Sequence, residues 1–118
     1  MSDVTVLHNP KCSTSRAALE AVDAAGAQAE VVQYLKEPLD EAALRELVGK
    51  LEDEPTDLVR RDAFFTEQGL TDADVATVDQ VVAVLVEHPR LMQRPVLVKG
   101  DVAIIGRPKD RVAPFLAR

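Results

Sequence analysis

The sequence has little of several residue types, and each shortage excludes a kind of bond, site or core. It contains one cysteine among 118 residues, it has no tryptophan, and aromatic residues make up only 3% of it. A single cysteine can form neither an internal disulfide nor a cysteine-rich metal site. Aliphatic side chains must therefore fill the interior, and a chain of this length is long enough to bury one hydrophobic core.

Excess positive charge and long apolar runs are also missing. The formal net charge is −6, which argues against non-specific binding to nucleic acid because such binding depends on a basic surface. No run approaches the length of a membrane span, and no basic segment precedes an apolar one at the N-terminus. We therefore expect a cytoplasmic protein of one domain, residues 1–118, that binds neither nucleic acid nor a membrane.

The hydrophobic periodicity divides the chain into predicted strands and helices. In chain order these are strand 4–7, helix 13–25, strand 29–32, helix 41–49, helix 55–61, helix 78–86, strand 95–99, strand 102–105 and a short helix through residue 116. Gly26 is a plausible stop for the first helix, and Asp40 is a good N-cap for the next one. The order predicts an α/β protein with a thioredoxin-like fold, in which a mixed sheet is covered by helices and a helical insertion occupies about residues 40–90.

The lone cysteine, Cys12, lies in the segment His8–Arg16, between the first predicted strand and the first predicted helix. A helix N-terminus stabilises an anion by roughly 0.3–1 kcal/mol, and the nearby cations Lys11 and Arg16 favour negative charge further. Thiolate is the reactive form of cysteine, and positive surroundings produce it. Although a lone cysteine is often an inert buried side chain, the polar, turn-forming neighbours here favour a reactive one.

Three separated segments of the chain resemble the glutaredoxin-dependent arsenate reductase family, the ArsC type. The first is His8–Arg16, similar to His-Asn-Pro-x-Cys-x-Thr-Ser-Arg; the second is Leu58–Arg61, read as a helix; the third is His88–Val98, followed by Gly106-Arg107-Pro108. Tyr34-Leu35-Lys36-Glu37-Pro38 is similar to a further family pattern. The likeness runs nearly end to end and implies a thioredoxin-like fold.

The resemblance also implies roles for individual residues. Cys12 would be the nucleophile that attacks arsenate, and His8 would help to lower its pKa, although His8 could equally be a turn residue bonded to backbone. Arg60, Arg94 and Arg107 would hold the oxyanion, and Arg94-Pro95 would precede a cis proline beside the site. Three other arginines, Arg61, Arg90 and Arg111, have no such support, and we expect them to be solvated, like the carboxylates Asp62, Glu67 and Asp72.

Two-electron reduction of arsenate consumes two thiols, and this chain has one. The second thiol must therefore come from outside, as glutathione or another low-molecular thiol, with a glutaredoxin-type protein to clear the mixed disulfide. We expect no bound cofactor and no metal ion, and we expect a monomer.

Two other functions are compatible with the sequence. One is a thiol reductase of the same family with a different substrate. The other is a regulator that binds RNA polymerase, as in the Spx branch of the superfamily. Regulators of that branch typically carry a Cys-x-x-Cys redox switch near this place, whereas here the second position is Ser15. The arginines also favour the enzyme.

Overall fold

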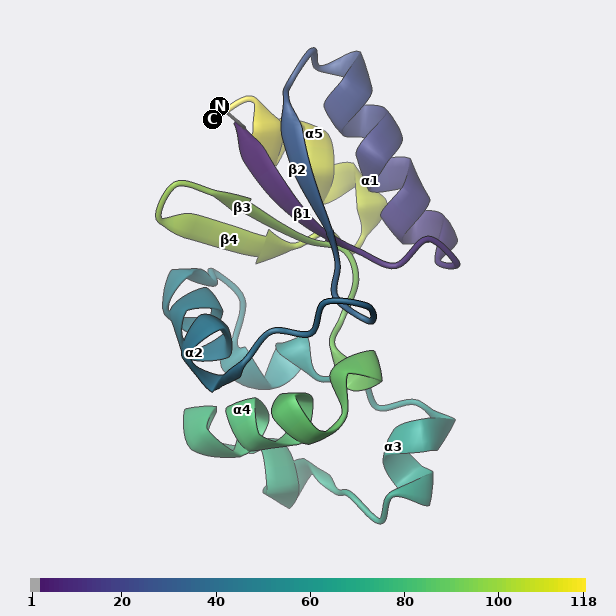
Figure 1. Cartoon of the computed structure of the whole chain (residues 1–118), viewed down its shortest axis with the longest axis vertical. Helices are drawn as coiled ribbons and strands as arrows, with labels where there is room; N and C mark the ends of the chain where they lie inside the picture. Colours follow the sequence, from purple (N-terminus) through teal and green to yellow (C-terminus); the bar gives the residue numbers. More distant parts are fainter. Residues whose placement is uncertain (1–2) are drawn as a thin grey trace.

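A four-stranded mixed sheet organises the computed structural model, which describes residues 3–118 (Figure 1). Strand β1 (Val4–His8) runs parallel to β2 (Ala29–Gln33) and antiparallel to β3 (Val96–Lys99), which forms a hairpin with β4 (Val102–Ile105). The resulting strand order is β2-β1-β3-β4. The predicted α/β class with a mixed sheet is confirmed.

Helices α1 (Ser13–Ala24) and α5 (Val112–Leu116) cover one face of the sheet. Side chains alternate between the two faces of a strand, so Val4 and Val6 of β1 point toward these helices while Leu7 points the other way. The buried cluster on this face consists of Val4, Val6, Ala18, Val22, Leu97, Ile104, Val112 and Phe115.

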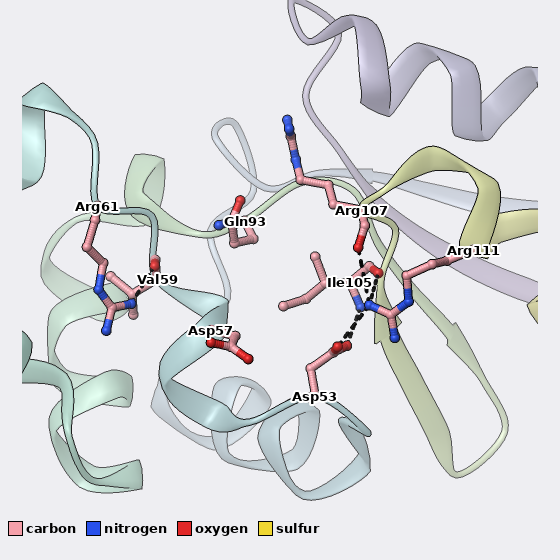
Figure 2. Close-up of a pocket in the computed structure, with 8 residues that line it drawn as sticks. All are labelled: Asp53, Asp57, Val59, Arg61, Gln93, Ile105, Arg107 and Arg111. Carbon is pink, nitrogen blue, oxygen red and sulfur yellow. Dashed lines mark hydrogen bonds and ion pairs between the residues drawn. The ribbon is translucent and has the colours of Figure 1, made fainter.

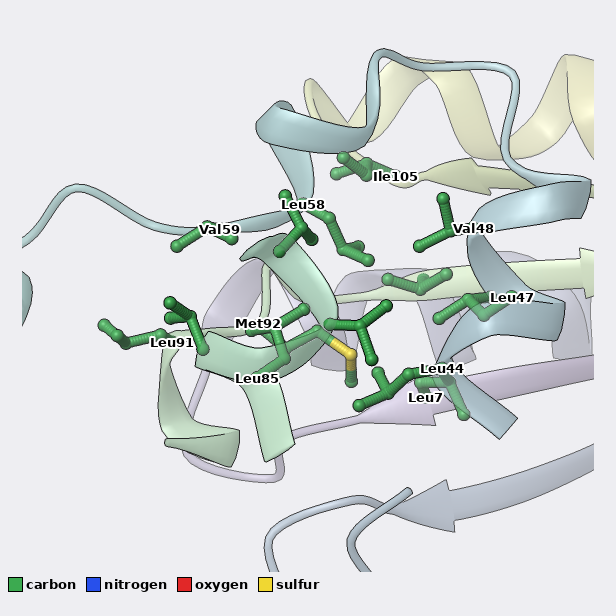
Figure 3. Close-up of a cluster of buried hydrophobic side chains, with 14 of the residues drawn as sticks. Leu7, Leu44, Leu47, Val48, Leu58, Val59, Leu85, Leu91, Met92 and Ile105 are labelled. Atoms are coloured by element: carbon green, nitrogen blue, oxygen red, sulfur yellow. The ribbon is translucent and has the colours of Figure 1, made fainter. Parts of the chain in front are cut away.

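The segment between β2 and β3 is helical and packs on the opposite face. It contains, in chain order, α2 (Glu41–Lys50), a 3₁₀ helix (Pro55–Leu58), α3 (Ala63–Glu67), a second 3₁₀ helix (Asp72–Val75), α4 (Val78–Glu87) and a third 3₁₀ helix (Pro89–Leu91). Figure 3 shows aliphatic side chains of this segment, with Met92, packed against Leu7 and Ile105 of the sheet. Because this cluster joins the helical segment to the sheet, the two parts share one core.

The predicted stop at Gly26 and the predicted N-cap at Asp40 are confirmed. Gly26 takes the left-handed conformation after α1, with φ of 70°, and Gly100 does so between β3 and β4, with φ of 58°. The carboxylate of Asp40 accepts a hydrogen bond of 2.8 Å from the Ala43 amide and so caps α2.

The predicted helix over residues 55–61 is wrong in its second half. The 3₁₀ helix ends at Leu58, and Val59 forms an isolated antiparallel bridge with Met92. The Arg60 amide donates to the Leu91 carbonyl at 2.7 Å, so the chain is extended there. Pairing with a distant segment overrides the local helical pattern.

No helix within residues 3–118 has the length and apolar composition needed to cross a bilayer.

Candidate active site around Cys12

The turn between β1 and α1 places Cys12 at the N-cap of α1, where its backbone is extended. The Cys12 amide donates to the Asn9 carbonyl at 3.0 Å, and the Arg16 amide donates to the Cys12 carbonyl at 3.0 Å. These bonds fix the sulfur above the first turn of the helix, whose amides have no partner within the helix. Cys12 is half-buried, so its thiol remains accessible.

Opposing effects set the charge state of the Cys12 sulfur. Partial burial by itself raises the pKa of the thiol, but hydrogen bonds from the Ser15 amide, the Arg94 guanidinium and the Thr14 amide, and the charge of Arg107, outweigh it. The net result is a pKa below the usual range of cysteine. The structure therefore supports the predicted thiolate and assigns its stabilisation to the helix N-terminus and two arginines.

Arg94 and Arg107 reach the sulfur from two adjacent loops, each ending in a cis X–Pro bond, as expected for Arg94-Pro95 and also seen at Arg107-Pro108. Arg107 donates from Nη2 to Cys12 Sγ at 3.2 Å and from Nε to the Arg94 carbonyl at 2.7 Å. Nε of Arg94 is buried and has no hydrogen-bond partner among residues 3–118. An unpaired buried donor is costly, and such a group is often explained by a ligand.

The third predicted arginine, Arg60, lies close to the other two. Burial lowers the pKa of its guanidinium, and the positive charges of Arg94 and Arg107 lower it further. Its own partner is the Asp62 carboxylate, 3.3 Å away and partly exposed. Asp62 also caps α3 by accepting from the Phe65 amide, so it is not simply a solvated charge. The charges of Arg94 and Arg107 thus act on Arg60, which places the three guanidinium groups near one another.

His8, which we expected either to help lower the pKa of Cys12 or to bond to backbone in the turn, contacts a side chain. Its Nδ1 lies 2.7 Å from the hydroxyl of Ser15, which is fully buried and also accepts from the Asn9 amide at 3.1 Å. Burial lowers the pKa of His8, and the charge of Arg16 lowers it further, so the neutral imidazole is favoured. The contacts of His8 therefore hold the end of β1 against α1, and the lowered pKa of Cys12 arises from other groups.

Tyr34, just beyond β2, belongs to the same site and was not singled out from the sequence. The side chain is 1% exposed, and its hydroxyl lies 3.5 Å from the Met92 carbonyl. Burial raises the pKa of Tyr34, whereas hydrogen bonds with Asn9 and Arg94 oppose the rise. The signal that could have identified it is a lone tyrosine at the start of the resembling segment Tyr34-Leu35-Lys36-Glu37-Pro38.

Two of the arginines that we expected to be solvated, Arg61 and Arg111, make hydrogen bonds to other parts of the protein. Arg111 donates from Nη1 to the Asp53 carboxylate at 2.8 Å and to the Ile105 carbonyl at 2.9 Å (Figure 2). Arg61 donates to the Thr56 carbonyl at 2.5 Å and pairs with Asp72 at 3.1 Å, while the Asp72 side chain is 87% exposed, as expected for a solvated carboxylate.

Arg90, the third of that group, is exposed, and its guanidinium lies over the Phe64 ring. Within residues 3–118, no group of three or more His, Cys, Asp or Glu side chains is arranged to hold a metal ion.

Comparison with known proteins places this geometry in a family. The family model described as "ArsC family" matches residues 7–115. An arsenate reductase of Neisseria meningitidis serogroup A is 33% identical over 118 residues, covering 98% of this chain and 100% of the relative. An Escherichia coli K12 protein, YfgD, whose name states no activity, is 36% identical over 111 residues, covering 92% of each chain. The solved structure of an arsenate reductase from Vibrio cholerae superposes with a TM-score of 0.85 and 31% identity, covering 96% of this chain and 97% of that one. With a match that spans nearly the whole chain in both sequence and fold, the protein belongs to the ArsC family.

Proposed function

We propose that this protein is an arsenate reductase in which Cys12 is the nucleophile and an external thiol supplies the second reducing equivalent. The observation that carries the proposal is the contact of 3.2 Å between Arg107 Nη2 and Cys12 Sγ, beside an Arg94 guanidinium that also lowers the pKa of this thiol. A thiolate beside converging guanidinium groups is suited to an oxyanion with an electrophilic centre. The similarity to named arsenate reductases identifies arsenate as the oxyanion to test first.

In the first step, the Cys12 thiolate attacks arsenic and a sulfur–arsenic bond forms. One arsenic–oxygen bond breaks, and the departing oxygen leaves as water after taking up protons. Arginine keeps its charge at any working pH and offers paired donors to a tetrahedral oxyanion. Arg60, Arg94 and Arg107 would hold the three remaining oxygens and stabilise the charge that develops on them.

In the second step, an external thiolate attacks Cys12 Sγ. The sulfur–arsenic bond breaks with its electron pair on arsenic, which changes from As(V) to As(III) and leaves as arsenite. The two sulfurs now form a mixed disulfide. A second external thiol, or a glutaredoxin-type protein, exchanges with that disulfide through its own thiolate and restores Cys12. Overall, one arsenate and two thiols give one arsenite, one disulfide and one water.

The proposal is tested by arsenate-dependent oxidation of NADPH in the presence of glutathione, glutathione reductase and a glutaredoxin. We expect turnover by the wild type, none by Cys12→Ser, and a strongly raised KM for arsenate in Arg94→Ala. Arg45→Gln is the matched control, because Arg45 is exposed on α2 and, among residues 3–118, pairs with the surface carboxylates of Glu41 and Asp79.

A substantial rate in Cys12→Ser would exclude Cys12 as the nucleophile. A folded wild type that reduces no arsenate with any thiol would instead favour another oxyanion substrate or a binding role.

A further inference from the structure

An ion pair between Asp53 and Arg111 lies against the segment of chain that carries Arg107. Arg111 Nη1 donates to Asp53 Oδ1 at 2.8 Å, and the two side chains are mostly buried, with 33% of Arg111 and 17% of Asp53 exposed. The partners come from distant parts of the chain, since Asp53 follows α2 and Arg111 ends the 3₁₀ helix Lys109–Arg111. The mechanism proposed above gives neither residue a role.

Asp53 reaches this place because the residues after α2 run along the outer edge of β4. Leu51 forms a parallel bridge with Ala103, and the Glu52 amide donates to the Ala103 carbonyl at 2.9 Å. Within residues 3–118, β4 is the last strand of the sheet, so its outer edge has no further strand to pair with. The carboxylate of Asp53 supplies an acceptor there, because Asp53 Oδ2 accepts from the Ile105 amide at 2.9 Å.

The Arg111 guanidinium binds the same segment through its carbonyls. Nη1 donates to the Ile105 carbonyl at 2.9 Å and to the Arg107 carbonyl at 3.3 Å, in addition to Asp53 (Figure 2). Hydrogen bonds in which one partner is ionised are roughly twice as strong as those between neutral groups. Two charged side chains therefore fix three polar groups of the backbone between Ile105 and Arg107.

The side chain of Arg107 extends from this segment away from the ion pair. Figure 2 shows the Arg107 carbonyl turned toward Arg111 and the Arg107 guanidinium turned the other way. At that end, Nε donates to the Arg94 carbonyl at 2.7 Å and Nη2 donates to Cys12 Sγ at 3.2 Å. A functional group works only when neighbouring bonds hold it within about 0.5 Å of its productive position. The backbone of Arg107 is thus a point at which its contact with the sulfur can be gained or lost.

We propose that Asp53 and Arg111 are positioning residues for Arg107, which they hold through its backbone so that its guanidinium meets Cys12 and the oxyanion. The inference rests on the proposed function for the oxyanion, whereas the contact between Arg107 and Cys12 belongs to the structure itself. The hydrogen bonds of Asp53 and Arg111 within residues 3–118 do not include one to the sulfur. Both residues would therefore act through Arg107.

The opposite charges of the two residues distinguish positioning from a direct effect of charge on Cys12. If they acted through charge alone, removing Asp53 would lower the pKa of the thiol and removing Arg111 would raise it. If they position Arg107, both removals raise it, because the guanidinium moves away from the sulfur. The pH at which alkylation by iodoacetamide reaches half of its maximal rate reports this pKa, since the thiolate is the reactive form.

We expect Asp53→Ala and Arg111→Met each to raise this midpoint by roughly half a pH unit. An opposite charge within ~4–6 Å shifts a pKa by about 1–3 units, and a displaced guanidinium keeps part of that effect, so the rise should be smaller than in Arg107→Ala. In the Arg107→Ala background, Asp53→Ala should cause no further rise, because no guanidinium is left to displace.

Two controls exclude general effects of mutation. Arg118→Met breaks an ion pair of the same length, 2.8 Å, to Glu52, the residue before Asp53, and should leave the midpoint unchanged. Val75→Ala removes buried side-chain atoms in the second 3₁₀ helix, outside the segment 105–107, and should lower the melting temperature without moving the midpoint. Thermal melting shows which variants fold. If Asp53→Ala does not fold, Asp53→Asn replaces it and should give a smaller rise.

The outcomes separate this inference from the proposed reaction. A midpoint that does not rise when Asp53 is replaced, or that rises equally in Arg118→Met or Val75→Ala, would overturn the positioning role and leave the reaction standing. Rises in both Asp53→Ala and Arg111→Met, in a protein that reduces no arsenate, would retain the positioning role and overturn the reaction.

Discussion

At the scale of single residues, Cys12 shows how a half-buried thiol can be kept ionised. Burial disfavours the thiolate, and the bonds from two amides and Arg94, together with the charge of Arg107, more than compensate. The sequence predicted the location of the sulfur at a helix N-terminus because that depends on adjacent residues. It could not predict from local pattern which arginines meet there, because Arg107 lies 95 positions away in the chain.

The ionisation of Cys12 predicts a pH profile for its alkylation by iodoacetamide. The thiolate fraction rises as pH rises through the pKa of the folded state, so the rate should reach half of its maximum below about pH 8.5, the value for an ordinary cysteine. Arg107→Ala should move this midpoint upward, because it removes a positive charge at 3.2 Å.

The control for that profile is Arg90→Ala, which removes an exposed guanidinium that contacts Phe64. Its midpoint should equal that of the wild type. A wild-type midpoint at or above the ordinary value, or no change in Arg107→Ala, would contradict the activated thiolate.

At the scale of elements, the loops that carry Arg94 and Arg107 are held together by close packing. The Gly106 amide donates to the Pro95 carbonyl at 2.8 Å, and a Cβ added at Gly106 would lie 2.8 Å from Pro95 Cγ and 2.9 Å from Leu97 Cδ1. Glycine is needed there because the side chains of Pro95 and Leu97 pack directly against its Cα, not because of an unusual φ. Arg107, next in sequence, depends on this contact for its position.

We therefore expect Gly106→Ala to lower the free energy of unfolding by about 1–3 kcal/mol, the usual cost of overpacking a core. Urea denaturation measures the change. Gly49→Ala is the matched control, since Gly49 lies on α2 with no atom within 4 Å of an added Cβ, and it should be stabilising by up to about 1 kcal/mol. Equal stabilities for the two variants would contradict the close approach at Gly106.

Caps and turns could be predicted from local sequence patterns, whereas contacts between distant segments could not. The caps and turns at Gly26, Asp40 and Gly100 were predictable because each depends on one residue and its neighbours. The helix expected through Arg61 was wrong because Val59 pairs with Met92, which is distant in sequence. The bond from Arg111 to Asp53 was missed for the same reason.

At the scale of the whole molecule, two hydrophobic clusters lie on opposite faces of one sheet. The strands contribute side chains to both clusters. Loss of packing on either face would therefore expose apolar side chains of the sheet. The site lies where the helical segment meets the ends of the strands, and a net charge of −6 coexists with three arginines converging there. Composition alone predicted the acidic surface but not this local concentration of positive charge.

The shared sheet predicts one cooperative unfolding transition. Urea unfolding followed by far-UV circular dichroism and by the reactivity of Cys12 should give coincident curves. Leu58→Ala, at a position that is 0% exposed in the cluster of Figure 3, should shift both curves together by about 2–5 kcal/mol. Two separate transitions would show that the helical segment and the sheet unfold independently.

The most direct test of an oxyanion site at Cys12 is protection of the sulfur from iodoacetamide, a neutral reagent, by increasing concentrations of arsenate. Comparing rates with and without arsenate for each protein at one pH separates protection from any change in thiol pKa. We predict saturable protection of the wild type, and at least tenfold more arsenate for half-protection in Arg94→Ala, corresponding to about 1.4 kcal/mol. An alkylation rate of the wild type that arsenate does not change, or equal protection of Arg94→Ala, would contradict the site.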